Sequence, residues 1–118
     1  MSHVTIYHNP RCSKSRQTLA LVEEHGIEPD IVKYLETPPS EAQLAEILDL
    51  LGVEPQDLMR KHEQAYKDAG LDDETLSRAE QIRRMVQFPK VIERPIVIVG
   101  DQAVIGRPPE NVLKILKG

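Results

Sequence analysis

The chain has 118 residues, with 19 acidic and 15 basic side chains and a formal net charge of -4. This length fits one domain with its own core, and the acidic balance argues against a general nucleic-acid-binding surface. The sequence contains one cysteine, no secretory leader and no apolar run of membrane-spanning length, so we expect a cytoplasmic protein without disulfides or a membrane partner.

The first third of the chain alternates between strand and helix. Residues 4–7 are predicted to form a strand and residues 30–34 a second one. Between them, residues 13–24 are predicted to form a helix that ends at Gly26 and directs Leu19 and Val22 inward. A strand, a helix and a strand within about thirty residues predict a right-handed parallel crossover.

The middle of the chain carries helical signals. Ser40 and Gln43 have the spacing of a capping box, and Gly52 ends the helix that follows, whose apolar positions are Leu44, Ile47, Leu48 and Leu51. Pro55 suits a first helical turn, and a later apolar stripe consists of Leu76, Ala79, Ile82 and Val86. We expect a single domain over residues 1–118 with a helical insert at about residues 37–89.

The last third is predicted to form a hairpin and a helix. Residues 96–99 and 103–105 are strand-like, and Gly100-Asp101 between them fits a two-residue turn. Pro108 and Pro109 open a last predicted helix with apolar residues Val112, Leu113, Ile115 and Leu116. This order of elements predicts an α/β fold with a mixed sheet.

Cys12 falls where the first predicted strand turns into the first predicted helix. The free N–H groups at a helix start and the positive end of its dipole both favour a thiolate over a thiol. Arg11, Lys14 and Arg16 add positive charge, and residues 8–17 are polar apart from Pro10 and Cys12 itself. We therefore interpret Cys12 as a nucleophile that works beside an anion, rather than as a small core residue.

The order of elements resembles the thioredoxin fold, in which a reactive cysteine begins the first helix and a cis proline opens the strand opposite. Pro95 occupies the place of that proline, which favours a cis Arg94–Pro95 bond over an ordinary strand-opening proline. Ser15 stands where a second cysteine would be, so a resolving thiol must come from another molecule. Its hydroxyl can hydrogen-bond a thiolate or an oxyanion, or else satisfy the backbone of the first turn.

A more specific resemblance spans nearly the whole chain. The matching segments are residues 5–10 with Cys12 and Ser15-Arg16, then residues 34–36 with Pro38-Pro39, residues 58–61, residues 94–97 and residues 106–108. Together they resemble the glutaredoxin-coupled arsenate reductases of the ArsC family, within the thioredoxin-like superfamily that also contains Spx-like proteins.

The resemblance implies a set of site residues. In the family, a catalytic cysteine works with three arginines that converge on the oxyanion, and their counterparts here are Cys12, Arg60, Arg94 and Arg107. Guanidinium groups suit this role because they offer planar, bidentate donors. His8 matches a histidine that helps to lower the cysteine pKa when protonated, although an ordinary loop histidine is an equal alternative. Ser15, Arg16 and Pro95 complete the expected substrate-binding set, and the scattered histidines lack the spacing of a metal site.

The resemblance also implies a reaction. The Cys12 thiolate attacks arsenate, glutathione attacks the adduct as a reducing co-substrate, and glutaredoxin removes the glutathione so that arsenite is released; no bound cofactor is expected. Two alternatives stay open at this point. One is a glutathione-dependent thiol reductase with another substrate, and the other is a thioredoxin-fold regulator that binds RNA polymerase, although such regulators use a second cysteine where this chain has Ser15.

Overall fold

The computed structural model describes residues 3–116, and contacts between Cα atoms divide the chain into two compact units. The first unit contains the chain before Pro38 and after Glu93, and the second unit is Pro38–Glu93. The predicted helical insert falls almost wholly within the second unit.

The first unit is built on a mixed four-stranded sheet with the strand order β2-β1-β3-β4. Central strand β1 pairs in parallel with β2, which places Ile6 opposite Ile31, and in antiparallel with β3, which places Ile6 opposite Val97. Strands β3 and β4 form an antiparallel hairpin. The strands are β1 (Val4–His8), β2 (Asp30–Lys33), β3 (Ile96–Val99) and β4 (Gln102–Ile105). The sheet confirms the predicted α/β, thioredoxin-like fold class.

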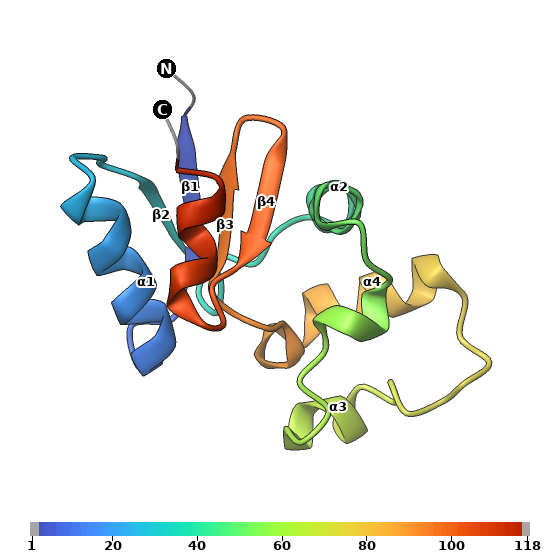
Figure 1. Ribbon diagram of the computed structural model, residues 1–118. Helices are drawn as coiled ribbons and strands as arrows, with labels where there is room; N and C mark the ends of the chain where they lie inside the picture. The colour runs from blue at the N-terminus through green and yellow to red at the C-terminus, as the bar shows by residue number, and fades with distance from the viewer. Residues whose placement is uncertain (1–2, 117–118) are drawn as a thin grey trace. The chain divides into compact units, whose positions relative to one another are not determined.

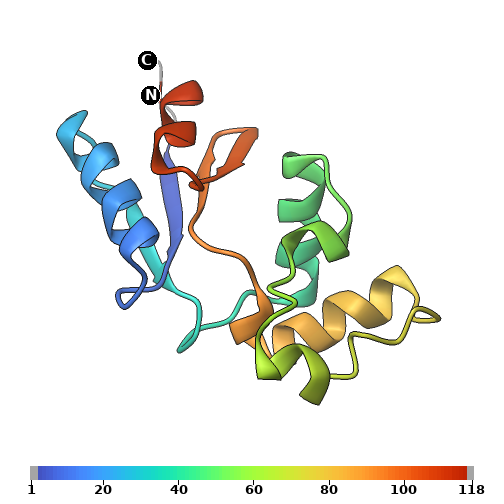
Figure 2. The same cartoon turned by 60° about the horizontal axis from the view of Figure 1, so that its bottom comes forward.

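Helix α1 (Ser13–Glu24) and the 3₁₀ helix η3 (Pro109–Lys114) pack against each other and against the sheet, as Figures 1 and 2 show. Side chains on one face of a strand recur at every second position, and Val4 and Ile6 of β1 follow this rule. The buried residues of this core are Val4, Ile6, Val22, Val97, Val112, Ile115 and Leu116. Burial of this apolar surface is the main force that holds α1 in place.

The buried face of α1 is more polar than the sequence predicted. Ser15, Thr18 and Val22 are its buried residues, whereas Leu19 is only partly buried. Two hydroxyl groups therefore occupy the helix face that a purely apolar pattern would have filled with larger side chains. Buried hydroxyl groups need hydrogen-bond partners, and those partners lie at the candidate site described below.

The hairpin turn is confirmed, because Val99 pairs with Gln102 and leaves Gly100-Asp101 as the two turn residues. Gly100 has a φ of 61°, the left-handed value that tight hairpin turns require.

Two other elements differ from their predictions. Strand β2 ends one residue earlier than predicted, since the carbonyl of Lys33 accepts the N–H groups of Glu36 and Thr37 in a turn. The last predicted helix is a short 3₁₀ helix, whose bonds run from i to i+3.

The second unit is helical. Its elements are α2 (Glu41–Leu51), η1 (Pro55–Leu58), α3 (Gln64–Asp68), α4 (Arg78–Gln87) and η2 (Pro89–Val91). The predicted capping box is confirmed: the Gln43 N–H donates to the Ser40 hydroxyl, and the Ser40 N–H donates to the Gln43 side chain. Helix α2 then ends at Gly52 with a φ of 68°.

The predicted apolar stripe near α4 is partly wrong. Ile82 is buried, but its buried companion in α4 is Met85, and Ala79 is exposed. Leu76 precedes the helix, because the Ser77 hydroxyl caps α4 by accepting the N–H of Glu80. The capping residue Ser77 thus fixes the first residue of α4, and with it which side chains of the helix face inward.

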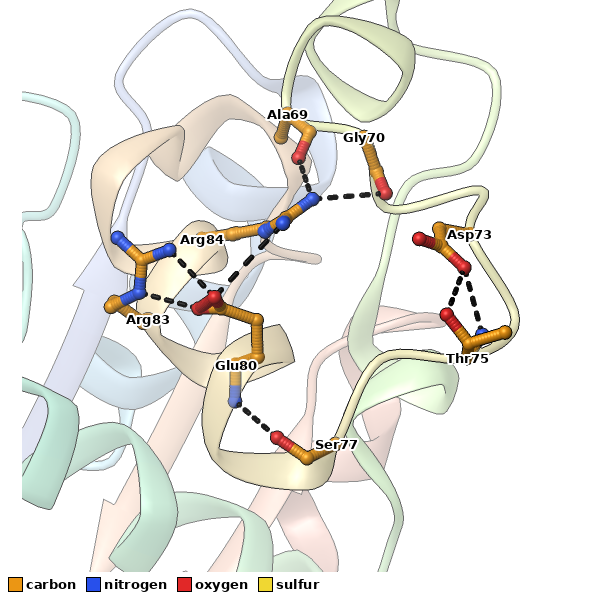
Figure 3. A network of polar contacts seen from close by, with 8 residues as sticks. All are labelled: Ala69, Gly70, Asp73, Thr75, Ser77, Glu80, Arg83 and Arg84. Atoms are coloured by element: carbon orange, nitrogen blue, oxygen red, sulfur yellow. Dashed lines mark hydrogen bonds and ion pairs between the residues drawn. The ribbon is translucent and has the colours of Figure 1, made fainter.

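Charged side chains tie α4 to the chain that precedes it, as Figure 3 shows. Arg84 donates from Nη1 to the carbonyl oxygens of Ala69 and Gly70, and Glu80 holds both Arg83 and Arg84. Each of these groups is partly exposed, so we assign them a role in fixing the loop rather than a large share of the stability.

In residues 3–116, no helix combines the length and apolarity needed to cross a membrane.

We expect Ser40→Ala to lower the free energy of unfolding by about 1 kcal/mol, because the first turn of α2 loses its hydroxyl acceptor. Urea titration followed by circular dichroism measures the change. Ser40→Thr is the matched control, since it retains the hydroxyl and should stay close to the wild type. Equal losses in both variants would contradict the capping role of Ser40.

Candidate active site

The ends of three strands meet at one edge of the first unit's sheet. Pairing of Tyr7 with Ile96, and of Ile96 with Ile105, brings the end of β1, the start of β3 and the end of β4 together. The loop before α1, the Arg94-Pro95 segment and the Gly106-Arg107 segment continue from these ends. Residues that are far apart in the sequence therefore lie close together where these three strand ends meet.

Asn9 shapes the loop between β1 and α1. Its backbone carbonyl accepts the N–H of Cys12 at 3.0 Å, and its side-chain oxygen accepts the N–H of Arg11 at 3.0 Å. Its own N–H donates to the Ser15 hydroxyl at 3.1 Å. Asn9 is 7 % exposed, so a tight turn with satisfied polar groups presents Cys12 at the start of the helix.

Cys12 is the residue immediately before α1 and is 9 % exposed, which makes it less accessible than the polar neighbourhood predicted. The Nη2 atom of Arg107 lies 3.3 Å from its sulfur, within hydrogen-bonding range. The same guanidinium donates from Nε to the carbonyl oxygen of Arg94 at 2.8 Å. This second bond fixes the plane of the guanidinium while its Nη2 atom meets the sulfur.

The pKa of the Cys12 thiol is lowered overall. Burial is the largest single influence and on its own would raise that pKa. A hydrogen bond from the backbone N–H of Ser15, one from the side chain of Arg94, and the positive charges of Arg107 and Arg94 together outweigh burial. Because the thiolate is the reactive form of cysteine, this environment prepares Cys12 for attack on an electrophile.

The peptide bond between Arg94 and Pro95 is cis, as the fold resemblance favoured. A second cis bond, between Arg107 and Pro108, was not predicted. The Gly106 N–H donates to the Pro95 carbonyl at 2.9 Å, so the segments that carry Arg94 and Arg107 are hydrogen-bonded to each other. The structure therefore brings both of these predicted arginines to Cys12.

Ser15 and His8 form a buried pair. The Ser15 hydroxyl lies 2.6 Å from His8 Nδ1 and also accepts the N–H of Asn9. Ser15 is fully buried and His8 is 5 % exposed. The Ser15 hydroxyl is thus bonded to the loop backbone and to an imidazole. Separately, the backbone N–H of Ser15 hydrogen-bonds Cys12 and favours its thiolate form.

The pKa of His8 is lowered from 6.5, first by burial and then by the positive charges of Lys33 and Arg16. This shift favours the neutral imidazole at neutral pH and disagrees with the protonated ring that the sequence analysis invoked. A neutral ring that carries its proton at Nε2 can accept a hydrogen bond from the Ser15 hydroxyl at Nδ1. We therefore regard His8 as a group that orients the loop through Ser15.

Arg16 follows the thiol on the exposed side of α1. Its Nη1 atom donates to the carbonyl oxygen of Pro10 at 2.9 Å, which braces the loop before Cys12. Its backbone N–H donates to the carbonyl of Cys12 at 3.0 Å as part of the first helical turn.

Arg60, the remaining predicted arginine, belongs to the second unit. Its guanidinium donates to Glu93 at 2.8 Å and also lies 3.4 Å from a carboxylate oxygen of Glu63. Its side chain is 12 % exposed. Two carboxylates therefore hold the Arg60 charge within the helical unit, and its predicted role at an oxyanion stays a prediction.

Sequence reasoning missed Thr18, and it quoted Asn9 and Gly106 only as parts of motifs, without a role at the site. An Asn-Pro pair is a known turn signal, which marks Asn9 as a turn residue in the sequence. Thr18 had no such signal, because a threonine within a helix is more often exposed. In residues 3–116, no cluster of three or more His, Cys, Asp or Glu side chains is arranged to hold a metal ion.

We expect His8→Gln to lose less stability than the wild type when the pH falls from 7 to 5. The pKa of His8 is lower in the folded chain than its ordinary value of 6.5, so the unfolded chain binds a proton more readily. The contribution of the neutral ring is present above pH 6.5 and is lost as the pH falls toward the lower, folded-state pKa. Gln offers an acceptor without a titrating group.

Urea unfolding of both proteins at the two pH values measures this difference. The same comparison with His25→Gln, at an exposed histidine that follows α1, controls for the replacement of a histidine in general. A parallel loss in the wild type and in His8→Gln would contradict the assignment of a lowered His8 pKa.

Comparisons with known proteins find relatives that match nearly the whole chain. The chain is 53% identical over 114 residues to "Uncharacterized protein YfgD" of Escherichia coli K12, and the match covers 96% of each chain. It is 50% identical over 114 residues to a protein of Haemophilus influenzae named "Arsenate reductase", covering 96% of this chain and 98% of that one. The solved "Arsenate reductase from Vibrio cholerae" superimposes with a TM-score of 0.93 at 51% identity, over 98% of each chain.

A family model described as "ArsC family" matches residues 7–115, a stretch that includes the Cys12 loop, both hairpin strands and both arginines beside the sulfur. A match of this extent, together with relatives of this identity, shows that the chain belongs to the ArsC family.

Proposed function

We propose that this protein is an arsenate reductase in which the Cys12 thiolate is the nucleophile. The observation that carries the proposal is the 3.3 Å contact between the Cys12 sulfur and Arg107 Nη2, at a thiol with a lowered pKa. Arg94 adds a second cation at the same sulfur. A reactive thiolate next to two guanidinium groups suits an electrophile that is itself an oxyanion, and the names of the relatives support arsenate as that oxyanion.

The first step forms a bond between sulfur and arsenic. The thiolate attacks As(V), one As–O bond breaks, and the departing oxygen takes two protons and leaves as water. No electrons have changed hands at this stage, so arsenic is still As(V) in the Cys12 adduct. The N–H groups at the start of α1 and the guanidinium groups of Arg94 and Arg107 offset the charge on the remaining oxygens.

The reduction then needs thiols from outside the chain, because the chain holds one cysteine. We propose that glutathione attacks the adduct and that glutaredoxin removes the glutathione afterwards. The glutathione thiol displaces a second oxygen of the adduct as water, so that arsenic is bonded to both sulfurs. A glutaredoxin thiolate then attacks the glutathione sulfur; these two sulfurs form a disulfide, the electron pair of the broken S–As bond stays on arsenic, and As(V) becomes As(III). Water then cleaves the bond between arsenic and the Cys12 sulfur, which releases arsenite and returns the Cys12 thiol. Glutathione is a co-substrate in this scheme, and the chain needs no bound cofactor.

The remaining site residues act around this step. Pro95 precedes β3 beside Arg94, and Arg16 braces the loop next to the incoming oxyanion. Ser15 and His8 keep the loop in the shape that presents the sulfur. We propose that Arg60 contributes a third guanidinium to the oxyanion, on the basis of its matching motif.

We expect Cys12→Ser to abolish arsenate-dependent oxidation of NADPH in an assay with glutathione, glutaredoxin and glutathione reductase. A hydroxyl resembles a thiol in size, so the variant should keep the fold. The serine hydroxyl does not ionise near neutral pH and takes no part in thiol redox chemistry, so it cannot replace the thiolate as the nucleophile. Circular dichroism confirms the fold. Turnover by folded Cys12→Ser would overturn the covalent scheme.

We expect Arg94→Ala and Arg107→Ala each to lower kcat/KM for arsenate by about 10²-fold, the typical effect of removing one donor that faces developing charge. Arg78→Ala is the matched control, because Arg78 pairs with Asp49 on the exposed surface of the helical unit. It should keep the kinetics of the wild type. Unchanged kinetics in both site variants would contradict the oxyanion assignment.

A mixed disulfide of glutathione provides the competing substrate in an assay with glutathione and glutathione reductase but without glutaredoxin, which would itself reduce such a disulfide. Turnover of the disulfide without turnover of arsenate would identify the protein as a thiol reductase with another electrophile. Turnover of arsenate that depends on Cys12 supports the proposal.

A further inference from the structure

The side of α1 that continues from Cys12 carries a buried threonine with an unusual contact. Ser15 lies one helical turn after Cys12, and Thr18 lies one turn after Ser15, so the three side chains follow a single stripe of the helix. Thr18 is fully buried. Its hydroxyl donates to the Lys14 carbonyl at 2.8 Å and reaches the Gly106 carbonyl at 3.3 Å, which is on the segment that carries Arg107.

Gly106 approaches Thr18 too closely for any larger residue. A Cβ atom at Gly106 would lie 2.5 Å from Thr18 Oγ1, 2.9 Å from Thr18 Cγ2 and 2.8 Å from Pro95 Cγ. Real Cβ atoms do not make contacts under 3.0 Å. The backbone at Gly106 is therefore clamped between α1 and Pro95, and its N–H is bonded to the Pro95 carbonyl.

These contacts form a closed path that includes the Cys12 sulfur. The path leads from Cys12 along α1 to Thr18, through the hydrogen bond to Gly106, along the chain to Arg107, and back to the Cys12 sulfur through Nη2. The position of the Arg107 backbone determines whether its guanidinium can reach both the sulfur and the Arg94 carbonyl. We propose that Thr18 is a positioning residue, whose contact with Gly106 sets the backbone of Arg107 so that the guanidinium meets the Cys12 sulfur.

The proposal rests on the proposed function only in taking Cys12 as the working thiolate, and its test requires no arsenate. The readout is the Cys12 pKa, measured from the ultraviolet absorbance of the thiolate and from the pH dependence of alkylation by iodoacetamide. A protein that has a low Cys12 pKa but no turnover of arsenate would refute the proposed function and leave this inference standing.

Thr18→Val is the decisive variant, because valine has the shape of threonine but places a methyl group where the hydroxyl meets Gly106. We expect the Cys12 pKa to rise by about half a unit or more as Arg107 moves away from the sulfur. Thr18→Ser retains the oxygen and should bring the pKa back toward the wild-type value. An unchanged pKa in folded Thr18→Val would overturn the proposal.

The double variant Thr18→Val with Arg107→Ala separates positioning from a general loss of structure. If Thr18 acts through Arg107, Thr18→Val should not raise the Cys12 pKa further once Arg107 is absent. An equal rise in both backgrounds would overturn the proposal, because Thr18 would then act on the thiol by another route.

Thr75→Val is a matched control for the loss of a threonine hydroxyl. Thr75 donates its hydroxyl to Asp73 in the helical unit, as Figure 3 shows, and the variant should leave the Cys12 pKa unchanged. If Thr18→Val fails to fold, Thr18→Ser and Thr18→Ala provide the same comparison: the pKa should rise in the alanine variant alone. Equal values in these two variants would overturn the proposal.

Discussion

At Cys12 two effects oppose each other: burial of the side chain favours the neutral thiol, and the groups around the sulfur favour the thiolate. The net effect is a lowered pKa, for which positive groups have to be held close to the sulfur. An arginine side chain has many rotamers, and holding it in one of them costs conformational entropy. The bond from Arg107 Nε to the Arg94 carbonyl restricts those rotamers, so one cation is fixed by the backbone that precedes Pro95.

The same requirement accounts for the polar face of α1. Leucine or valine at positions 15 and 18 would bury more apolar surface and, on area alone, would stabilise the fold more. Ser15 and Thr18 instead connect the helix to the Asn9 loop and to Gly106 through hydrogen bonds. Each buried hydroxyl has partners, which removes most of the cost of its burial. The helix thus gives up some hydrophobic stabilisation in return for a defined position of the groups around the sulfur.

Local patterns predicted the parts of the structure that depend on neighbouring residues. The Ser40 capping box, the Gly100-Asp101 turn and the place of Cys12 before α1 each depend on a few consecutive residues. The contact of Arg107 with Cys12 joins residues 95 positions apart, and only the resemblance to a family anticipated it. Thr18 was missed because its partner is distant in sequence, and Ala79 was misplaced because the cap at Ser77 shifts the helical period.

In the proposed reaction, the two arginines beside Cys12 stabilise first the thiolate and then the arsenic-bound oxygens. Before attack, their positive charges offset the repulsion between the thiolate and a doubly charged arsenate. Once the S–As bond forms, sulfur no longer carries the negative charge, and the same guanidinium groups face only the oxygens on arsenic. The charge thus moves toward the oxyanion while the cations stay in place, and donors that are already oriented need no reorganisation during the step. For this reason a fixed guanidinium serves better here than a mobile lysine, whose ammonium group is strongly hydrated and would have to lose its water again at each stage.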